Sequence, residues 1–137
     1  MRSRIVAYFL ISILLVSLVP STSAYKGYQL SRGAISDFTL IDQDGENVTL
    51  NRSNGEILVV AFIFTRCTDV CPVITQALRS VQQGLSSEYS DEVEFMSISV
   101  DPGHDTPEQL KAFTELHDVN WSHLTGDLEV MEEVWNS

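Results

Sequence analysis

The sequence predicts an α/β fold with a parallel sheet and a β-hairpin at the start of the domain. Two apolar runs of strand length, Ile57–Phe64 and Val93–Val100, alternate with segments whose apolar residues recur at helical spacing. Strands that alternate with helices form parallel sheets joined by right-handed crossovers. The 137 residues show no internal repeat, and this length is enough for one domain.

The first 24 residues have the pattern of a secretory signal peptide. Arg2 and Arg4 precede the uncharged stretch Ile5–Val19, and Thr22-Ser23-Ala24 supplies small residues at a cleavage site. An uncleaved membrane anchor is the alternative, although a spanning helix needs about 20 apolar residues. Both interpretations place the remainder outside the cytoplasm. The sequence therefore predicts three parts: a signal peptide or anchor (1–24), a linker (25–36) and the folded domain (37–137).

The folded domain should open with a hairpin. Phe38–Leu40 and Val48–Leu50 alternate apolar and polar residues, and Asp42–Gly45 between them has the composition of a turn. A polar loop, Asn51–Gly55, leads to the apolar run Ile57–Phe64. This run is rich in β-branched and aromatic residues, which favours a central strand covered on both faces.

A helix should follow, beginning at Cys71-Pro72 because proline is favoured at the first helical position. Its predicted apolar face recurs at helical spacing. That face consists of Ile74, Ala77, Leu78, Val81 and Leu85. The aromatic residues expected in the core are Phe62, Phe64, Phe95, Phe113 and Trp135.

The second strand, Val93–Val100, should place Met96, Ile98 and Val100 on one face. Ser97 and Ser99 on the other face would let a helix approach closely. Thr106, Pro107 and Gln109 mark the start of the next helix. The remaining predictions are a helix face of Leu110, Phe113 and Leu116, a short strand within Val119–Leu124, and a last helix capped by Thr125 or Asp127 with Leu128, Met131 and Trp135 on its face.

The charge of the chain limits the kinds of partner that it can bind. It has 8 basic and 19 acidic residues, a net charge of −11. This excess argues against binding nucleic acid or anionic lipid. A solvated surface is the simplest interpretation, and a docking face for a basic partner is the alternative.

The only two cysteines, Cys67 and Cys71, lie four positions apart where the first long strand gives way to a helix. The carboxyl ends of parallel strands gather functional groups at one edge of the sheet. The loop Asp101–Asp105 should therefore lie beside the cysteines and bring His104 near the thiols. We interpret His117 as a surface residue and His123 as structural.

The surroundings of the cysteines should influence their reactivity. A thiol reacts or binds metal as the thiolate, and the free N–H groups at a helix start favour that charge. Arg66 should favour it as well, whereas Asp69 should oppose it. A closed structural zinc site needs four ligands, which the scattered histidines do not supply. Two soft thiolates select Cu(I), with zinc as the main competitor. The same pair could also form and break a disulfide, so the spacing leaves copper binding and redox exchange open.

Three motifs, in order, resemble the SCO/SenC family. They are Asp-Phe-Thr-Leu-Ile-Asp-Gln-Asp-Gly at 37–45, Phe-Thr-Arg-Cys-Thr-Asp-Val-Cys-Pro at 64–72 and Ser-Val-Asp-Pro-Gly-His-Asp-Thr-Pro at 99–107. The resemblance implies a thioredoxin-like fold and a copper chaperone that helps build the binuclear copper centre of cytochrome c oxidase subunit II. Cys67 and Cys71 match the family's copper-binding and redox-active pair, and Asp69 matches the acidic residue between them. We expect the chain to be exported, to the extracytoplasmic face of the membrane or the periplasm.

The resemblance also shows a departure. The family's third copper ligand is a histidine in a later segment, followed by a hairpin and a terminal helix, and no histidine of this sequence matches it. We therefore expect an incomplete thioredoxin-like domain that lacks its C-terminal strands and helix. His104 is a hypothetical substitute for the third ligand, because its loop should share the edge with the thiols.

Two other functions remain open. The cysteines could serve a thiol–disulfide oxidoreductase of the thioredoxin type, although thioredoxins have two residues between their cysteines and this chain has three. A peroxiredoxin-like peroxidase is more distant, because Thr65-Arg66-Cys67 is shorter than the Thr-x-x-Cys arrangement. We expect primarily a metallochaperone that carries Cu(I), with possible reductase activity.

Overall fold

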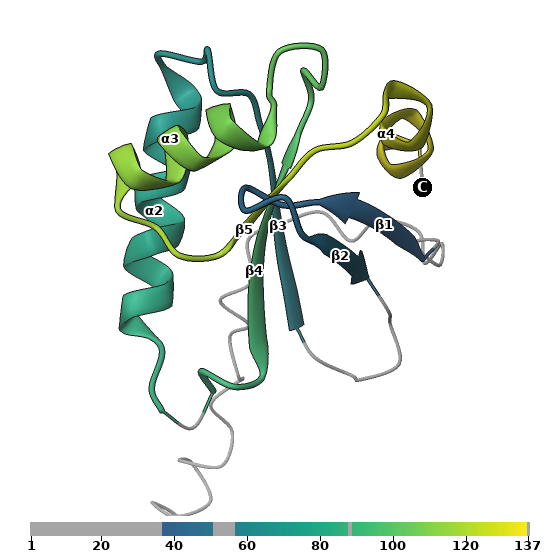
Figure 1. The fold of residues 1–137 in the computed structure, drawn as a ribbon. Helices are drawn as coiled ribbons and strands as arrows, with labels where there is room; N and C mark the ends of the chain where they lie inside the picture. Colours follow the sequence, from purple (N-terminus) through teal and green to yellow (C-terminus); the bar gives the residue numbers. More distant parts are fainter. Residues whose placement is uncertain (1–36, 51–56, 88, 137) are drawn as a thin grey trace, which may run out of the picture. The chain divides into compact units, whose positions relative to one another are not determined.

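A computed structural model describes residues 37–50, 57–87 and 89–136, which belong to one compact unit (Figure 1). The predicted signal peptide or anchor (1–24), the linker (25–36) and the loop Asn51–Gly55 lie outside the described residues. Within the described part, no helix has the length and apolar character to cross a membrane.

The predicted hairpin is confirmed. Strand β1 (Phe38–Ile41) pairs antiparallel with β2 (Asn47–Leu50). The turn between them is held by the carboxylate of Asp42, whose Oδ1 accepts the backbone N–H groups of Asp44 and Glu46, both at 2.9 Å. Gly45 has φ of +83°, a backbone conformation that glycine adopts without strain.

The main sheet is parallel, as predicted. It has the order β3 (Ile57–Ile63), β4 (Val93–Ser99), β5 (Ser122–Leu124). The predicted central position of the first long strand is not observed, because β3 pairs only with β4 among the described strands. An isolated antiparallel bridge between Ile41 and Thr125 ties β1 to the end of β5.

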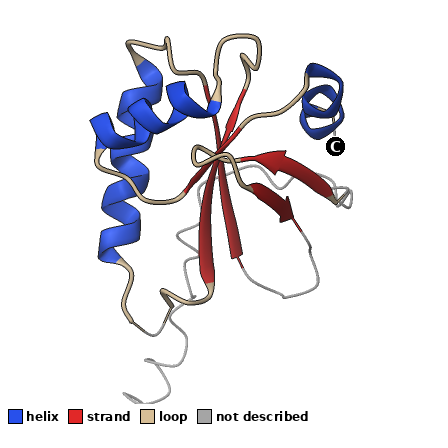
Figure 2. Ribbon diagram, viewed as in Figure 1, coloured by secondary structure: helices blue, strands red, loops and turns tan. Residues whose placement is uncertain are grey.

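The helices cover the two faces of the sheet unequally. Figures 1 and 2 show α2 (Val70–Gly84) and α3 (Pro107–His117) on one side, with the hairpin and α4 (Leu128–Trp135) on the other. Thr106 caps α3 as predicted, since its side chain accepts the N–H of Gln109. Asp127 is the N-cap residue of α4, without a side-chain capping hydrogen bond.

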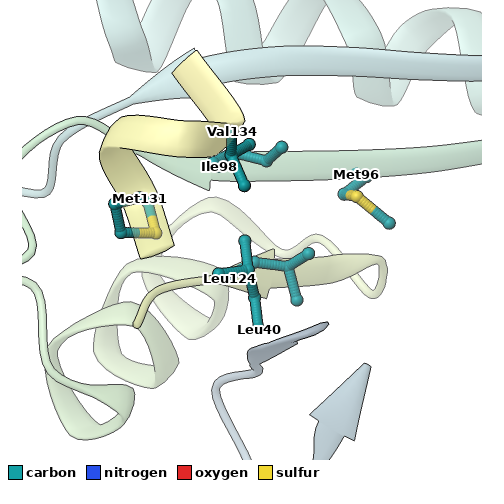
Figure 3. Packing of buried hydrophobic residues seen from close by; sticks show 6 residues of the cluster. All are labelled: Leu40, Met96, Ile98, Leu124, Met131 and Val134. Carbon is teal, nitrogen blue, oxygen red and sulfur yellow. The ribbon is translucent and has the colours of Figure 1, made fainter. Parts of the chain in front are cut away.

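Two apolar cores result from this arrangement. On the hairpin side, side chains from β1, the sheet and α4 converge (Figure 3). This core comprises Leu40, Met96, Ile98, Leu124, Met131 and Val134. The core on the helix side comprises Ala61, Ile63, Cys67, Cys71, Leu110 and Phe113. Both cysteines are thus part of the packing between β3 and the helices α2 and α3.

Helix α2 begins earlier than predicted and buries a different face. It starts at Val70 with Asp69 as N-cap, so Pro72 is its third residue. The buried line consists of Cys71 and Thr75, with Leu78 packed behind them. These residues recur at i, i+4 and i+7, which is one helical face.

The predicted apolar face of α2 is therefore wrong in part. Ile74, Ala77 and Val81 are exposed, with Val81 at 52%. The prediction failed because it counted only aliphatic residues, whereas a cysteine and a threonine fill the contact with the sheet. Leu116 of α3 and Leu128 of α4, at 78% and 57% exposure, were assigned to buried faces by the same rule.

The described elements cover one face of β3 only in part, contrary to prediction. Ala61 and Ile63 pack under the helices, but Phe62, which shares the opposite face with Leu58, is 52% exposed. The predicted burial of Phe62 and Phe64 is thus wrong in this structure, while Phe95 and Phe113 are buried as predicted. The described hairpin and α4 lie over β4 and β5 more than over β3.

Candidate functional site

The two cysteines lie together at the carboxyl end of β3, where the loop Phe64–Asp69 leads into α2. Both are free thiols, with 9% of Cys67 and 3% of Cys71 exposed. The backbone N–H of Cys71 donates to Sγ of Cys67 over 3.2 Å. The predicted pairing of these two residues at a strand-to-helix junction is what the structure shows.

Hydrogen bonds to Cys67 favour its thiolate form. The hydrogen bond from the Cys71 thiol is the largest cause that lowers the pKa of Cys67, and the backbone N–H of Cys71 adds to it. Backbone N–H groups of Asp69 and Val70 lower this pKa further, while burial opposes the change. The predicted effect of the helix start is therefore present, because these groups are the free donors of its first turn.

Arg66, which was expected to favour the thiolate form of the cysteines, has a different role. Its guanidinium pairs with the carboxylate of Asp101 at 2.5 Å, in the loop between β4 and α3. The groups that lower the pKa of Cys67 are Cys71 and the backbone amides, with Arg66 not among them. Arg66 links two loops of the site, and Asp69 acts as the helix N-cap.

Cys71 is the protonated partner of the pair. Burial is the main cause that raises its pKa, and the hydrogen bond that it donates to Cys67 raises it further. The negative charges of Cys67 and Asp105 act in the same direction. The two thiols therefore differ: Cys67 is the more acidic and more exposed one, and Cys71 holds its proton more strongly.

The loop Asp101–Asp105 lies at the same edge as the thiols, as the topology predicted. Asp105 is fully buried, and its carboxylate accepts hydrogen bonds from the hydroxyls of Thr65 and Ser99, both at 2.6 Å. The backbone N–H of Thr65 lies 3.2 Å from each oxygen of the same carboxylate. This network was not predicted. The available signals were Thr65, just before Cys67, and Asp105, just before the helix start at Thr106.

His104 lies beside this network. Its Nδ1 is 3.4 Å from the Thr65 hydroxyl and 3.3 Å from Asp105 Oδ1. Among the residues that the structure describes, Asp101, His104 and Asp105 form the one group of three whose ligand atoms lie within 4.8 Å of one another. Neither cysteine belongs to it, so this conformation does not support His104 as the third ligand of the thiol pair.

Comparison with known proteins identifies the family. The SCO1/SenC family profile matches residues 27–137. The chain belongs to this family. It is 41% identical over 95 residues to an SCO1 protein homolog of Bacillus subtilis. This match covers 67% of this chain and 49% of that protein. It is 30% identical over 97 residues to Protein sco1 of Schizosaccharomyces pombe, in a match that covers 71% of this chain and 37% of that protein. The chain thus spans about half the length, or less, of these curated relatives.

Solved SCO1/SenC structures show the same thioredoxin-like fold. The copper-bound ScoI of Bradyrhizobium japonicum matches with a TM-score of 0.61 and 33% identity, over 74% of this chain and 64% of that one. BsSco, described with a disulfide switch, matches with a TM-score of 0.64 and 37% identity, over 75% and 62%. Apo Sco1 of Thermus thermophilus matches with a TM-score of 0.71 and 28% identity, over 85% and 67%.

The thiol pair of this SCO1/SenC chain is chemically suited to copper. Two sulfur donors face each other, and soft thiolates favour Cu(I) and zinc over harder ions. Cys67 is the less buried of the two residues, at 9% exposure against 3% for Cys71. The same arrangement is suited to a reversible disulfide, because one thiol is acidic and the other is its neighbour.

The other two histidines have structural roles in the SCO1/SenC domain. His123 is fully buried, stacks on Trp121, and has its Nδ1 3.0 Å from the carbonyl oxygen of Trp121. Burial lowers the pKa of His123 to about 4. This confirms the structural interpretation of His123. His117 is half-buried against the ring of Phe113, so it is less exposed than predicted.

Proposed function

We propose that this chain is an exported copper chaperone that carries Cu(I) on the sulfurs of Cys67 and Cys71. The observation that carries the proposal is the hydrogen-bonded pair of free thiols at the start of α2, in a chain of the SCO1/SenC family. Solved relatives from Bradyrhizobium japonicum and yeast have copper bound. The copper ion is the cargo of such a protein.

The two thiols would contribute unequally to copper uptake. Cys67 is the easier one to deprotonate, since hydrogen bonds lower its pKa, so it meets the incoming ion first. Cys71 must lose its proton as the second sulfur binds, and copper uptake therefore releases protons. Transfer to an acceptor then proceeds by exchange of sulfur ligands, beginning at Cys67, which is the less buried of the two.

The destination that we propose is the binuclear copper centre of cytochrome c oxidase subunit II. Support comes from the description of BsSco as a member of a family of cytochrome c oxidase assembly proteins. The proposed location is the extracytoplasmic face of the membrane or the periplasm. The signal-like pattern of residues 1–24 supports it, as does a related SCO1/SenC lipoprotein of Bacillus anthracis.

A Cu(I) titration of the full chain against a competing chelator tests this proposal. Cys67→Ser and Cys71→Ser should each abolish stoichiometric binding, because each removes one of two soft donors. Thr68→Ala, an exposed residue of the same loop, is the matched control and should bind like the wild type. Unchanged copper affinity in either cysteine variant would overturn the assignment of the ligands.

A thiol–disulfide oxidoreductase is the second candidate, and the unequal acidity of the thiols favours it. The Cys67 thiolate would attack a substrate disulfide, forming a mixed disulfide and releasing one substrate thiolate. Cys71 would then attack Cys67, releasing the second substrate thiolate and leaving the Cys67–Cys71 disulfide. Two electrons pass to the substrate. Cys71→Ser should trap the mixed disulfide with a target protein, and absence of any trapped species would count against this activity.

A further inference from the structure

A buried carboxylate joins the loop Phe64–Asp69, which we call the thiol loop, to the loop between β4 and α3. Asp105, on the β4–α3 loop, has no exposed surface. Its oxygens accept the hydroxyl and the backbone N–H of Thr65, the residue two positions before Cys67. They also accept the hydroxyl of Ser99 at the end of β4. Asp105 therefore connects the start of the thiol loop to the last residue of the neighbouring strand.

A second link between the same loops lies at the surface. Arg66 pairs with Asp101 at 2.5 Å, with 62% and 31% of the two side chains exposed. Exposed ion pairs contribute little, because water screens them and long side chains lose freedom. The buried link is the stronger one, since a carboxylate away from water depends on the donors that it has.

The same side chains are better explained as a hydrogen-bonded network than as a metal site. Asp101, His104 and Asp105 have ligand atoms close enough to hold an ion. However, both oxygens of Asp105 already have hydroxyl donors at 2.6 Å, and Asp101 is paired with Arg66. An ion at this place would have to displace these partners.

We propose that Asp105 is a positioning residue for the thiol pair. By fixing Thr65 against β4, it holds the beginning of the loop in place. Cys67 N–H bonds to the carbonyl oxygen of Phe64 at 3.1 Å, and Cys67 Sγ meets the N–H of Cys71 at 3.2 Å. Fixing Thr65 therefore also restrains the position of the Cys67 sulfur. This inference rests on the proposed function, in which both sulfurs act on one ion or one disulfide.

The equilibrium of the thiols with glutathione measures how well they are held together. In this reaction the protein dithiol and glutathione disulfide give the protein disulfide and two glutathione molecules, so two electrons and two protons are exchanged. The equilibrium constant gives the effective concentration of one thiol at the other. If the thiol loop is free to move, the effective concentration falls even though the two thiol groups are chemically unchanged.

Thr65→Val is the key variant, because it removes the hydroxyl donor and leaves every charge of the protein unchanged. We expect the effective concentration to fall about tenfold at fixed pH, since a charge-assisted hydrogen bond is lost. Thr65→Ser retains the hydroxyl and should behave like the wild type. Asp105→Asn should lower the value as well, and the double variant should fall no further than the more affected single variant, since both changes break the hydrogen bond between Thr65 and Asp105.

Two controls separate positioning from general stability. Thr114→Val removes a buried hydroxyl in the second half of α3 that donates to the Lys111 carbonyl oxygen at 2.8 Å and takes no part in the network around Asp105. It should lower the unfolding free energy and leave the glutathione equilibrium unchanged. Arg66→Gln, which breaks the exposed link, should shift that equilibrium by less than about twofold.

The proposal is overturned if folded Thr65→Val has the effective concentration of the wild type, even if its stability is lower. If Asp105→Asn does not fold, the comparison of Thr65→Val with Thr65→Ser still decides the matter. The readout needs no copper, so failure of the wild type to bind Cu(I) would sink the chaperone proposal alone. A normal Cu(I) affinity with an unchanged glutathione equilibrium in Thr65→Val would sink this inference alone.

Discussion

The backbone N–H of Cys71 points at Sγ of Cys67 over 3.2 Å, so the second cysteine stabilises the thiolate of the first. The side chain of Cys71 contributes still more to this effect, as the largest cause of the lowered pKa of Cys67. The two residues therefore act as a pair before any ion or disulfide joins them.

Alkylation rates should reveal this dependence. In the wild type at neutral pH, iodoacetamide should modify Cys67 before Cys71, because Cys67 has the lower pKa and the larger exposure. In Cys71→Ala the thiol donor is lost, so the pH midpoint for alkylation of Cys67 should rise towards that of an ordinary cysteine. Peptide mass spectrometry across a pH series measures both effects. An unchanged midpoint in Cys71→Ala would contradict the role of the Cys71 thiol.

Acid should destabilise the domain through His123. Its pKa is lowered to about 4 in the folded state from an ordinary 6.5, so the unfolded chain binds more protons between these values. Stability is therefore present above pH 6.5 and is lost as the pH falls towards 4, by on the order of 3 kcal/mol. Urea unfolding at several pH values measures this loss.

A variant of His123 tests the cause. His123→Phe, which cannot take up a proton, should flatten the pH dependence over this range whatever its effect on absolute stability. The matched control is His117→Gln, at the half-buried histidine whose ring lies tilted against Phe113, and it should retain most of the slope. An equal slope in wild type and His123→Phe would assign the acid sensitivity to other groups.

The core on the hairpin side should tolerate truncation poorly. Leu124 is fully buried there, among Met96, Ile98 and Met131. Leu124→Ala should lower the unfolding free energy by about 2–5 kcal/mol, because transfer energy is lost and a cavity remains. Leu116→Ala removes the same atoms from a side chain that is 78% exposed, and its effect should be below about 1 kcal/mol. Equal losses in the two variants would mean that Leu124 is not in a close-packed site.

Gly126, between β5 and α4, approaches β1 closely. A Cβ at this position would lie 3.0 Å from Cδ2 of Leu40, whereas a Cβ at Gly103 would meet nothing within 4 Å. Gly126→Ala should therefore destabilise the domain by about 1–2 kcal/mol through overpacking. Gly103→Ala should be close to neutral. Thermal unfolding of the two variants provides the comparison, and equal midpoints would show that Leu40 moves aside freely.

The sequence predicted the elements of this fold well because each has a strong local signal. Asp42–Gly45 has turn chemistry, Thr106-Pro107 marks a helix start, and the long apolar runs are too short for helices. Chain order then required parallel pairing, which brought the loops after β3 and β4 to one edge. The location of Cys67 and Cys71 at the junction of a strand and a helix could be predicted from their positions in the sequence.

Side-chain burial and the polar network could not be read in the same way. The buried line of α2 passes through Cys71 and Thr75, which a hydrophobic pattern does not count. Ser99 was interpreted as a small residue for close packing, yet its hydroxyl binds Asp105. The same network joins Thr65 to Asp105, which lie 40 positions apart in the sequence. No local pattern records such a meeting.

The acidity of Cys67 depends on backbone N–H groups and a neighbouring thiol, with no lysine or arginine involved. Dissolved ions weaken the influence of an exposed cationic side chain, but they cannot enter a hydrogen bond between adjacent atoms. The reactivity of this sulfur should therefore depend little on ionic strength. In the exported protein that we propose, Cys67 would keep the same chemistry in dilute and in salty surroundings.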